Sequence, residues 1–103
     1  MEGQFNRKTK TEFHPHTNMA KASLNMMTRT AGISYKKNGI YMTCVDTGWI
    51  TDERPVNLRP PGFVPPLDCV DGAARIYDPI IMGITGKRLY NSVFLKDYVV
   101  SEW

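Results

Sequence analysis

Residues 40–45 place the strongest constraint on how this chain can fold. They read Ile, Tyr, Met, Thr, Cys and Val, so that apolar side chains stand at both odd and even positions. A strand that is apolar on both faces is typical of a buried parallel strand, which has neighbours on both edges and helices on both faces of its sheet. Gly39 precedes the run, and Asp46, Thr47 and Gly48 follow it with turn chemistry. The run therefore predicts an α/β fold.

A helix is predicted before this strand, beginning near Thr17. Apolar residues recur there at i, i+4, i+7 and i+11, which is the spacing of one helix face: Ala20, Leu24, Met27 and Ala31. A second apolar strip (Met19, Ala22, Met26) leaves only a narrow polar strip of Thr17, Lys21 and Thr28. A helix that is apolar over most of its circumference packs on two sides. We therefore expect it to lie between a sheet and another body, such as another subunit.

The second half of the chain predicts a loop, a helix and a last strand. Residues 51–66 are rich in proline and read as a long excursion or lid. Three- and four-residue steps then predict a helix over residues 68–81, started by Asp68 and shortened by Pro79; its periodic residues are Val70, Ala73, Ala74, Tyr77 and Ile81. Residues 89–95 predict the last strand, and residues 98–103 a tail.

Composition limits the organisation and the partners. A chain of 103 residues that is 42% hydrophobic suits one small domain, here residues 13–103 after a polar arm at residues 1–12, which we expect to be flexible. The net charge of +3 is spread along the chain, which argues against nucleic acid as a partner. No apolar run approaches the roughly 20 residues of a membrane span, and no signal peptide opens the chain. We expect a cytoplasmic protein with no membrane partner.

The cysteines and histidines predict no metal site. Cys44 and Cys69 lack CxxC spacing and stand in no ligand pattern with His14 or His16. Apolar neighbours favour buried free thiols at both positions.

Residues 14–31, HPHTNMAKASLNMMTRTA, resemble the active-site helix of the short-chain dehydrogenase/reductase family, in which YxxxK precedes an Ala- and Leu-rich stretch. The order of elements over residues 17–95 is also similar: helix, buried strand, turn, substrate loop, helix and last strand. The resemblance implies an α/β fold that is partial and Rossmann-like. It would be the second half of a doubly wound parallel sheet, with about two strands and two helices.

The resemblance implies roles for two residues of the first helix. Lys21 matches the family's lysine, which binds the ribose hydroxyls of the nicotinamide nucleotide and lowers the pKa of the catalytic tyrosine. Thr17 stands in the place of that tyrosine, one helical turn before Lys21. An aliphatic hydroxyl is too weakly acidic and too short to replace the phenol. His14 or His16 is the alternative proton source, since histidine titrates near neutrality.

The turn after the buried strand supplies the other candidate cofactor contacts. Thr47 stands where the family has proline, and Thr51 lies one residue short of the family's carboxamide-binding threonine. Gly48 and Ile50 fit the pattern, because glycine permits close backbone approach and the amide that follows could bind the nicotinamide carboxamide. Turn residues that merely end a strand would read the same way.

The implied function is that of a fragment of an NAD(P)-dependent oxidoreductase. No glycine-rich fingerprint follows a strand and opens a helix in residues 1–103, so tight binding of NAD(P) by this chain alone is not expected. The chain would be inactive alone, and its partner would be either the missing N-terminal Rossmann half or a second copy in a homo-oligomer.

Two other functions fit parts of the sequence. The run Val45, Asp46, Thr47, Gly48 resembles the signature of aspartic proteases, in which two copies of Asp46 would share a proton across a dimer axis. Trp49 stands where that family has Ser or Ala, and the predicted helices disagree with its all-β body. The third hypothesis is a non-catalytic interaction module, a pseudoenzyme that exposes apolar faces until a partner covers them.

Overall fold

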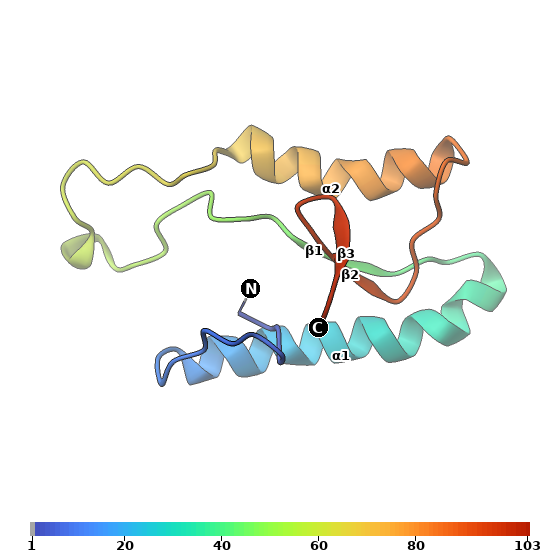
Figure 1. Ribbon diagram of the computed structural model, residues 1–103, viewed down its shortest axis with the longest axis horizontal. Helices are drawn as coiled ribbons and strands as arrows, with labels where there is room; N and C mark the ends of the chain where they lie inside the picture. The colour runs from blue at the N-terminus through green and yellow to red at the C-terminus, as the bar shows by residue number, and fades with distance from the viewer. Residues whose placement is uncertain (1) are drawn as a thin grey trace.

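The computed structural model describes residues 2–103, which form two long helices and three short strands (Figure 1). The order along the chain is α1 (Pro15–Tyr35), β1 (Thr43–Asp46), α2 (Cys69–Ile84), β2 (Val93–Lys96) and β3 (Val99–Ser101). Short 3-10 helices, η1 (Lys36–Asn38) and η2 (Val56–Leu58), lie in the connections. The predicted alternation of helix and strand is confirmed up to β2.

The sheet has the order β1-β2-β3 and mixes both strand orientations. β1 runs parallel to β2, with Cys44 opposite Phe94, and β2 runs antiparallel to β3. The expected fold class, the second half of a doubly wound parallel sheet with about two strands, is therefore wrong. The predicted tail contains a third strand, because Asp97 and Tyr98 both adopt positive φ (47° and 67°) and reverse the chain in two residues. Asp-Tyr lacks the glycine that usually announces such a hairpin.

The two helices lie on either side of the sheet in Figure 1. On one side, the Thr28 hydroxyl of α1 lies 3.1 Å from the Cys44 sulfur of β1. On the other side, Gly72 of α2 packs so closely on the residues after β1 that a Cβ there would come within 3.0 Å of Ile50 Cδ1. Both faces of β1 are thus covered by helices, as the sequence predicted. The strand is nevertheless half-buried and lies at the edge of the sheet, with β2 as its neighbour in the described residues, so the expectation of a buried strand is wrong.

Both helices extend beyond their predicted ends. α1 begins at Pro15, two residues before the expected start, and continues to Tyr35. α2 continues through Pro79 to Ile84, so the expectation that this proline shortens the helix is wrong. The strands are shorter than predicted: β1 begins at residue 43 rather than 40, and β2 at residue 93 rather than 89.

The face of α1 that packs on the sheet is polar, contrary to the pattern of its apolar residues. Asn25, Thr28 and Gly32 are buried, whereas Leu24 and Met27 are each 50% exposed. Small residues allow close approach: a Cβ on Gly32 would lie 2.4 Å from the Ser92 hydroxyl. The expectation that an apolar strip of α1 packs on the sheet is therefore wrong for the residues described. The buried apolar residues belong instead to the second half of the chain and are Tyr90, Phe94 and Leu95.

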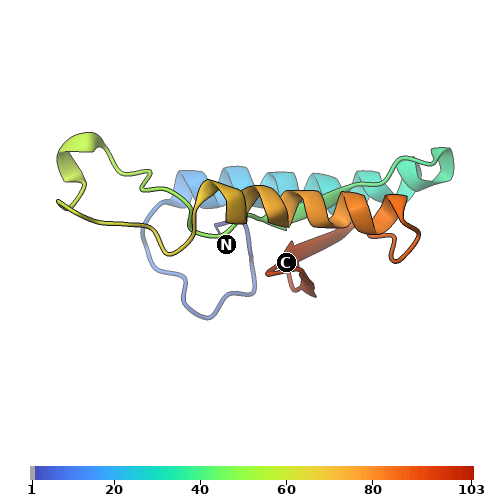
Figure 2. The same ribbon diagram turned by 90° about the horizontal axis from the view of Figure 1, so that it is seen from above.

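The N-terminal arm closes one side of the molecule. Asn25 Nδ2 donates to the Gly3 carbonyl (2.9 Å), and Gln4 Nε2 donates to the carbonyl of Glu102 (3.0 Å). Gly3 and Gln4 are buried, although residues 2–12 contain no helix or strand. Figure 2 shows the arm and β3 on the same side of the helix pair. The edge of β1 therefore lies on the side that the arm does not reach.

Candidate functional site

The residues that the sequence singled out on α1 share one helix face. Thr17, Lys21, Asn25 and Thr28 follow one another at steps of four, four and three residues, and Thr28 contacts β1 through Cys44. α1 and β1 run in opposite directions (Figure 1), so the first half of α1 passes the carboxyl end of β1. Lys21 stands two turns before Thr28, about 10 Å along the axis. The lysine is exposed there, and Thr17 is half-buried.

The arm lies directly beside Lys21. A Cβ on Gly3 would come within 2.6 Å of the carbonyl carbon and oxygen of Lys21, so the two backbones are in contact. Lys10 adds a link between the arm and α1, because its Nζ donates to Asn18 Oδ1 at 3.0 Å. Sequence reasoning did not foresee this contact, since residues 2–12 carry no periodic pattern.

The turn after β1 is built by its own residues. Asp46 Oδ1 accepts a hydrogen bond from the Gly48 amide at 2.9 Å, and Gly48 adopts a φ of 81°. A Cβ on Gly48 would also lie 2.4 Å from Leu67 Cδ1. Both the positive φ and this close contact therefore require glycine at position 48. The Gly48 amide is consequently engaged within the protein.

Asp46 is held in its charged form. Burial raises the pKa of its carboxyl, but the hydrogen bond from the Gly48 amide and the positive charge of Lys96 lower it, and the pKa lies below the ordinary 3.8. The two helices differ from the all-β body of aspartic proteases, which weighs against the protease hypothesis.

The remaining residues of the predicted turn contact α2. Thr47 Cβ would lie 3.8 Å from a Cβ on Gly72, and Ile50 packs against the same glycine. Thr51 is exposed, and its carbonyl accepts a hydrogen bond from Trp49 Nε1 at 3.0 Å. The predicted site residues thus fall into two groups: Thr17 and Lys21 belong to α1, while Thr47 and Ile50 contact the helix on the other side of β1.

The proline-rich excursion folds onto an aromatic cluster that the sequence did not reveal. The rings of Trp49 and Phe63 lie 5.0 Å apart, and the Arg54 guanidinium lies 5.3 Å from the centre of the Phe63 ring. Arg54 also pairs with Asp52 at 2.7 Å, which lowers the pKa of that carboxyl and raises the pKa of the guanidinium. Aromatic contacts between residues 14 apart in a loop leave no periodic signal.

Two surface regions lie away from the predicted residues. A cleft of about 260 Å³ lies between the arm and the C-terminus, lined by Gln4, Asn6, Arg7, Lys96, Ser101, Glu102 and Trp103. An apolar patch follows the exposed side of α2 and consists of Val70, Ala73, Ala74, Ile76, Tyr77 and Ile80. The same periodicity that predicted α2 found most of the patch residues.

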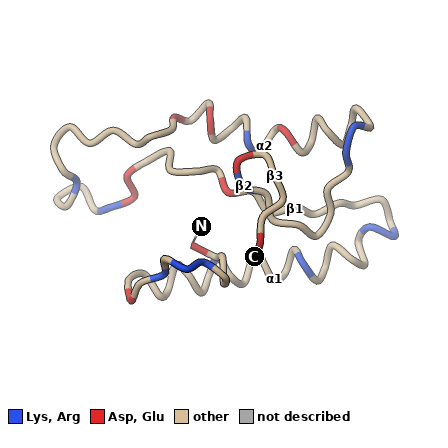
Figure 3. Tube along the Cα trace, viewed as in Figure 1, with Lys and Arg blue, Asp and Glu red and all other residues tan. Residues whose placement is uncertain are grey.

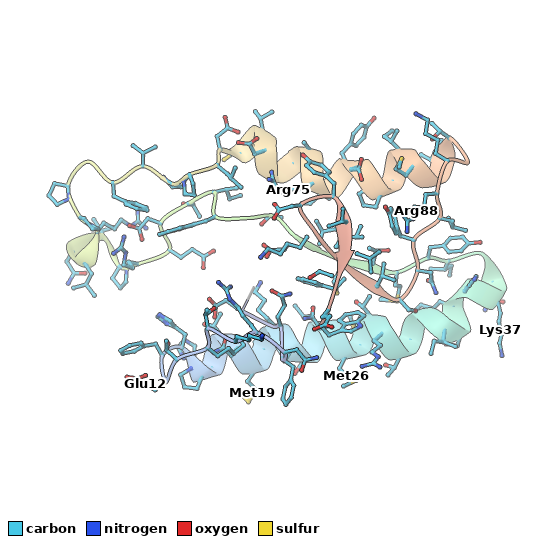
Figure 4. All side chains as sticks on the ribbon, viewed as in Figure 1. Glu12, Met19, Met26, Lys37, Arg75 and Arg88 are labelled. Atoms are coloured by element: carbon cyan, nitrogen blue, oxygen red, sulfur yellow. The ribbon has the colours of Figure 1, made fainter. Side chains whose placement is uncertain are left out.

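The charges form no single basic surface. Figure 3 shows Lys and Arg distributed over both helices, the arm and the loops. Arg75 is used internally: its Nη2 donates to Asp97 at 3.2 Å, and its guanidinium lies 5.3 Å from the centre of the Tyr98 ring (Figure 4). This contact fixes α2 against the β2–β3 hairpin.

Cysteines and acidic residues give no metal cluster over residues 2–103, where no group of three or more His, Cys, Asp or Glu side chains converges. Both thiols are free, with Cys44 half-buried and Cys69 exposed, so the expectation of burial is wrong for Cys69. None of the helices in this described part combines the length and the apolarity needed to cross a membrane.

The structure is a small α/β unit in which β1 forms one open edge of the sheet. Its sequence is 40% identical over 88 residues to an uncharacterized protein, R665, of Acanthamoeba polyphaga mimivirus. The match covers 77% of this chain but only 19% of the viral protein, so the chain spans about a fifth of that relative. No family model and no solved structure matches the chain.

Proposed function

We propose that this chain contributes the ribose-binding side of a nicotinamide nucleotide site to a cytoplasmic oxidoreductase similar to short-chain dehydrogenases, and that it is inactive alone. The supporting observation is the position of Lys21, exposed on the α1 face that packs on β1 and beyond the carboxyl end of that strand. In open α/β sheets, ligands bind outside the carboxyl ends of the strands. An ammonium group there has three donors for ribose hydroxyls.

The residues present fit only part of such a cofactor. Lys21 and Thr17 offer an ammonium and a hydroxyl, which suit the nicotinamide ribose. Asp46 accepts the hydrogen bond of the Gly48 amide, so the carboxamide contact is assigned to the amide that follows the glycine. Bound NAD(P) would supply the hydride chemistry, and the chain's own residues would orient its ribose.

The phosphates would need contacts from another segment. The first turn of α2 is closed by a capping box in which Asp68 and Asp71 each accept a hydrogen bond from the other's amide (2.9 and 3.0 Å). Their carboxylates occupy the helix terminus that could otherwise attract an anion, and their charge repels a pyrophosphate. This is the physical reason for proposing that the chain binds NAD(P) weakly by itself.

The proposal assigns Thr17 a binding role rather than a proton-transfer role. Its hydroxyl is aliphatic and stays protonated at neutral pH, so it can donate a hydrogen bond but not a proton. His14 and His16 stay candidates for the acid, because both are exposed at the start of α1, within a turn of Thr17.

The test compares nucleotide binding by the full chain and by two lysine variants. NADH and NADPH are titrated against the wild type, Lys21→Ala and Lys37→Ala, with saturation-transfer NMR reporting the nicotinamide protons. Loss of a charge-assisted hydrogen bond is worth about 1.5–3 kcal/mol, so Lys21→Ala should weaken binding roughly tenfold or more. Lys37 is also exposed, lies beyond the other end of α1 and serves as the matched control. An affinity that Lys21→Ala leaves unchanged overturns the proposal.

A non-catalytic interaction module is the second candidate. It is favoured by the exposed apolar side chains on both helices, among them Met19 (69%), Met26 (58%) and Val70 (75%). Met19 and Met26 point away from the sheet (Figure 4). Monomeric soluble proteins rarely leave such surfaces uncovered.

A further inference from the structure

We infer that Arg75 is a positioning residue for the turn after β1, because its guanidinium contacts both that turn and the β2–β3 hairpin and couples the two. The position of the hairpin then sets how the turn presents its backbone to a ligand. The inference rests on the proposed function in one respect: the turn carries the amide that is assigned to the nicotinamide carboxamide. The coupling itself is a property of this chain and can be measured without a nucleotide.

The two turns that Arg75 contacts lie at the same end of the sheet. β1 and β2 run parallel and pair over their whole length, so the residues that follow them meet at the carboxyl ends of both strands. Gly48 belongs to the first of these turns, and Asp97 and Tyr98 form the second. In open α/β sheets, this end is where ligands bind. A side chain that contacts both turns therefore acts at the edge where the proposed site lies.

The hairpin turn adopts a conformation that needs support from its surroundings. Asp97 and Tyr98 have φ of 47° and 67°, in the left-handed region that favours glycine. Residues with side chains persist in that region where neighbouring groups hold them there. Arg75 contacts both: its Nη2 donates to Asp97 Oδ1 at 3.2 Å, and its guanidinium lies 5.3 Å from the centre of the Tyr98 ring. Arg75 therefore stabilises the hairpin turn, which reaches α2 in Figure 1.

The same guanidinium lies beside the turn after β1. A Cβ on Gly48 would be in van der Waals contact with Arg75 Nε, 3.8 Å away, so the guanidinium borders the backbone of this turn. The Gly48 amide donates to Asp46 Oδ1 at 2.9 Å, which closes the turn from within. Arg75 Nη1 donates to the Asp71 carbonyl at 3.0 Å, which fixes the guanidinium relative to α2. The helix, the hairpin and the turn thus meet at one side chain.

The burial of Arg75 shows that its shape matters more than its charge. The side chain is 11% exposed, and its Nε is buried without a hydrogen-bond acceptor among the described residues. A buried donor without an acceptor costs free energy. The flat guanidinium explains that cost, because it spans the hairpin and the turn, which the compact ammonium of a lysine cannot do. Asp97 is 62% exposed, so its ion pair with Arg75 contributes little by itself.

The test follows the Gly48 amide by NMR in the complete 103-residue chain. Its hydrogen-exchange rate is compared with that of the Ser92 amide, which donates to the Met42 carbonyl at 2.7 Å, at the other end of the β1–β2 pair. Arg75→Met should raise the Gly48 rate relative to the Ser92 rate roughly tenfold, because the turn loses the support of a charge-assisted hydrogen-bond network. Arg75→Lys should not restore the wild-type ratio, because it keeps the charge and loses the planar group.

Two further variants complete the test. Asp97→Asn, in the hairpin, should raise the same ratio about twofold, because it removes one exposed ion pair and leaves the ring contact in place. This exposed position keeps the test valid if circular dichroism shows that Arg75→Met does not fold. Arg88→Met is the matched control: Arg88 also lies over an aromatic ring, that of Tyr90 at 4.9 Å, but it stands beyond the end of α2. It should leave the ratio unchanged.

Three results overturn the inference. One is an unchanged exchange ratio in Asp97→Asn and Arg75→Met. Another is an acceleration that the Ser92 amide matches, since Arg75 would then stabilise the whole fold and not the turn. The third is NADH that binds the wild type and Arg75→Met equally well. If Gly48 responds as expected but the wild type binds no NADH, the proposed function fails while the coupling by Arg75 stands.

Discussion

Single residues near β1 show how the same chemistry can serve a ligand or the fold. Gly48 suits close approach of a cofactor, but in the structure its positive φ and its contact with Leu67 account for the glycine. The sequence located the turn correctly, because Asp46, Thr47 and Gly48 are turn formers. It could not show that Asp46 would engage the Gly48 amide, since that depends on the path of the chain after β1.

Replacing Gly48 by alanine should destabilise the protein by about 1–3 kcal/mol, because a left-handed residue with a side chain costs roughly 1–2 kcal/mol and Leu67 must also move. Gly39→Ala is the matched control: Gly39 has a similar φ of 74°, but nothing lies within 4 Å of its added Cβ. Urea unfolding of both variants separates the two contributions. Equal losses would show that the Leu67 contact adds nothing.

The charge on Asp46 predicts a pH dependence. Its folded pKa lies below the ordinary 3.8, so the stability it contributes is complete above that value and is lost as the pH falls through the folded pKa. Asp46→Asn keeps an oxygen acceptor for Gly48 but cannot titrate, so its loss of stability between pH 5 and about pH 3 should be smaller than that of the wild type. Urea midpoints across this range measure the difference. An identical acid response in Asp46→Asn would contradict the assignment, and Glu53→Gln in the exposed loop is the control.

At the scale of elements, α2 carries the clearest local signal. Asp68 was predicted to start this helix, and the structure confirms it as the N-cap of a reciprocal capping box with Asp71. The end of the helix was not foreseen, because α2 continues through Pro79 to Ile84. Local sequence therefore predicts the start of a helix better than its end, because the end also depends on tertiary contacts.

Asp68→Ala should cost about 1 kcal/mol of stability, because the Asp71 amide loses its acceptor at 2.9 Å. Asp68→Asn retains a side-chain oxygen and should cost only a few tenths of that value. Thermal unfolding followed by circular dichroism measures both. A variant pair with the same melting temperature as the wild type would mean that the box does not stabilise α2.

At the scale of the whole molecule, the apolar surface exceeds what the chain can cover. Leu95, Phe94 and Tyr90 are buried, while apolar flanks of both helices face outward. The isolated chain should therefore associate non-stoichiometrically as its concentration rises. Met27→Lys and Ile80→Lys should each shift the mass measured by sedimentation toward the 11.7 kDa monomer. A wild type that stays monomeric at millimolar concentration would contradict this expectation.

The sequence by itself determined two helices and the strand between them, because 3.6-residue and two-residue periodicities are local properties that survive any arrangement. It also predicted a partner, from the number of apolar faces on α1. Only the tertiary structure decided which face of α1 meets the sheet. The stripe of Asn25, Thr28 and Gly32 packs on the sheet, because Gly32 and Thr28 let the two backbones approach closely and Asn25 binds the arm. The tertiary structure also produced the third strand, because β3 forms by pairing with β2 and the residues of its turn do not announce a hairpin.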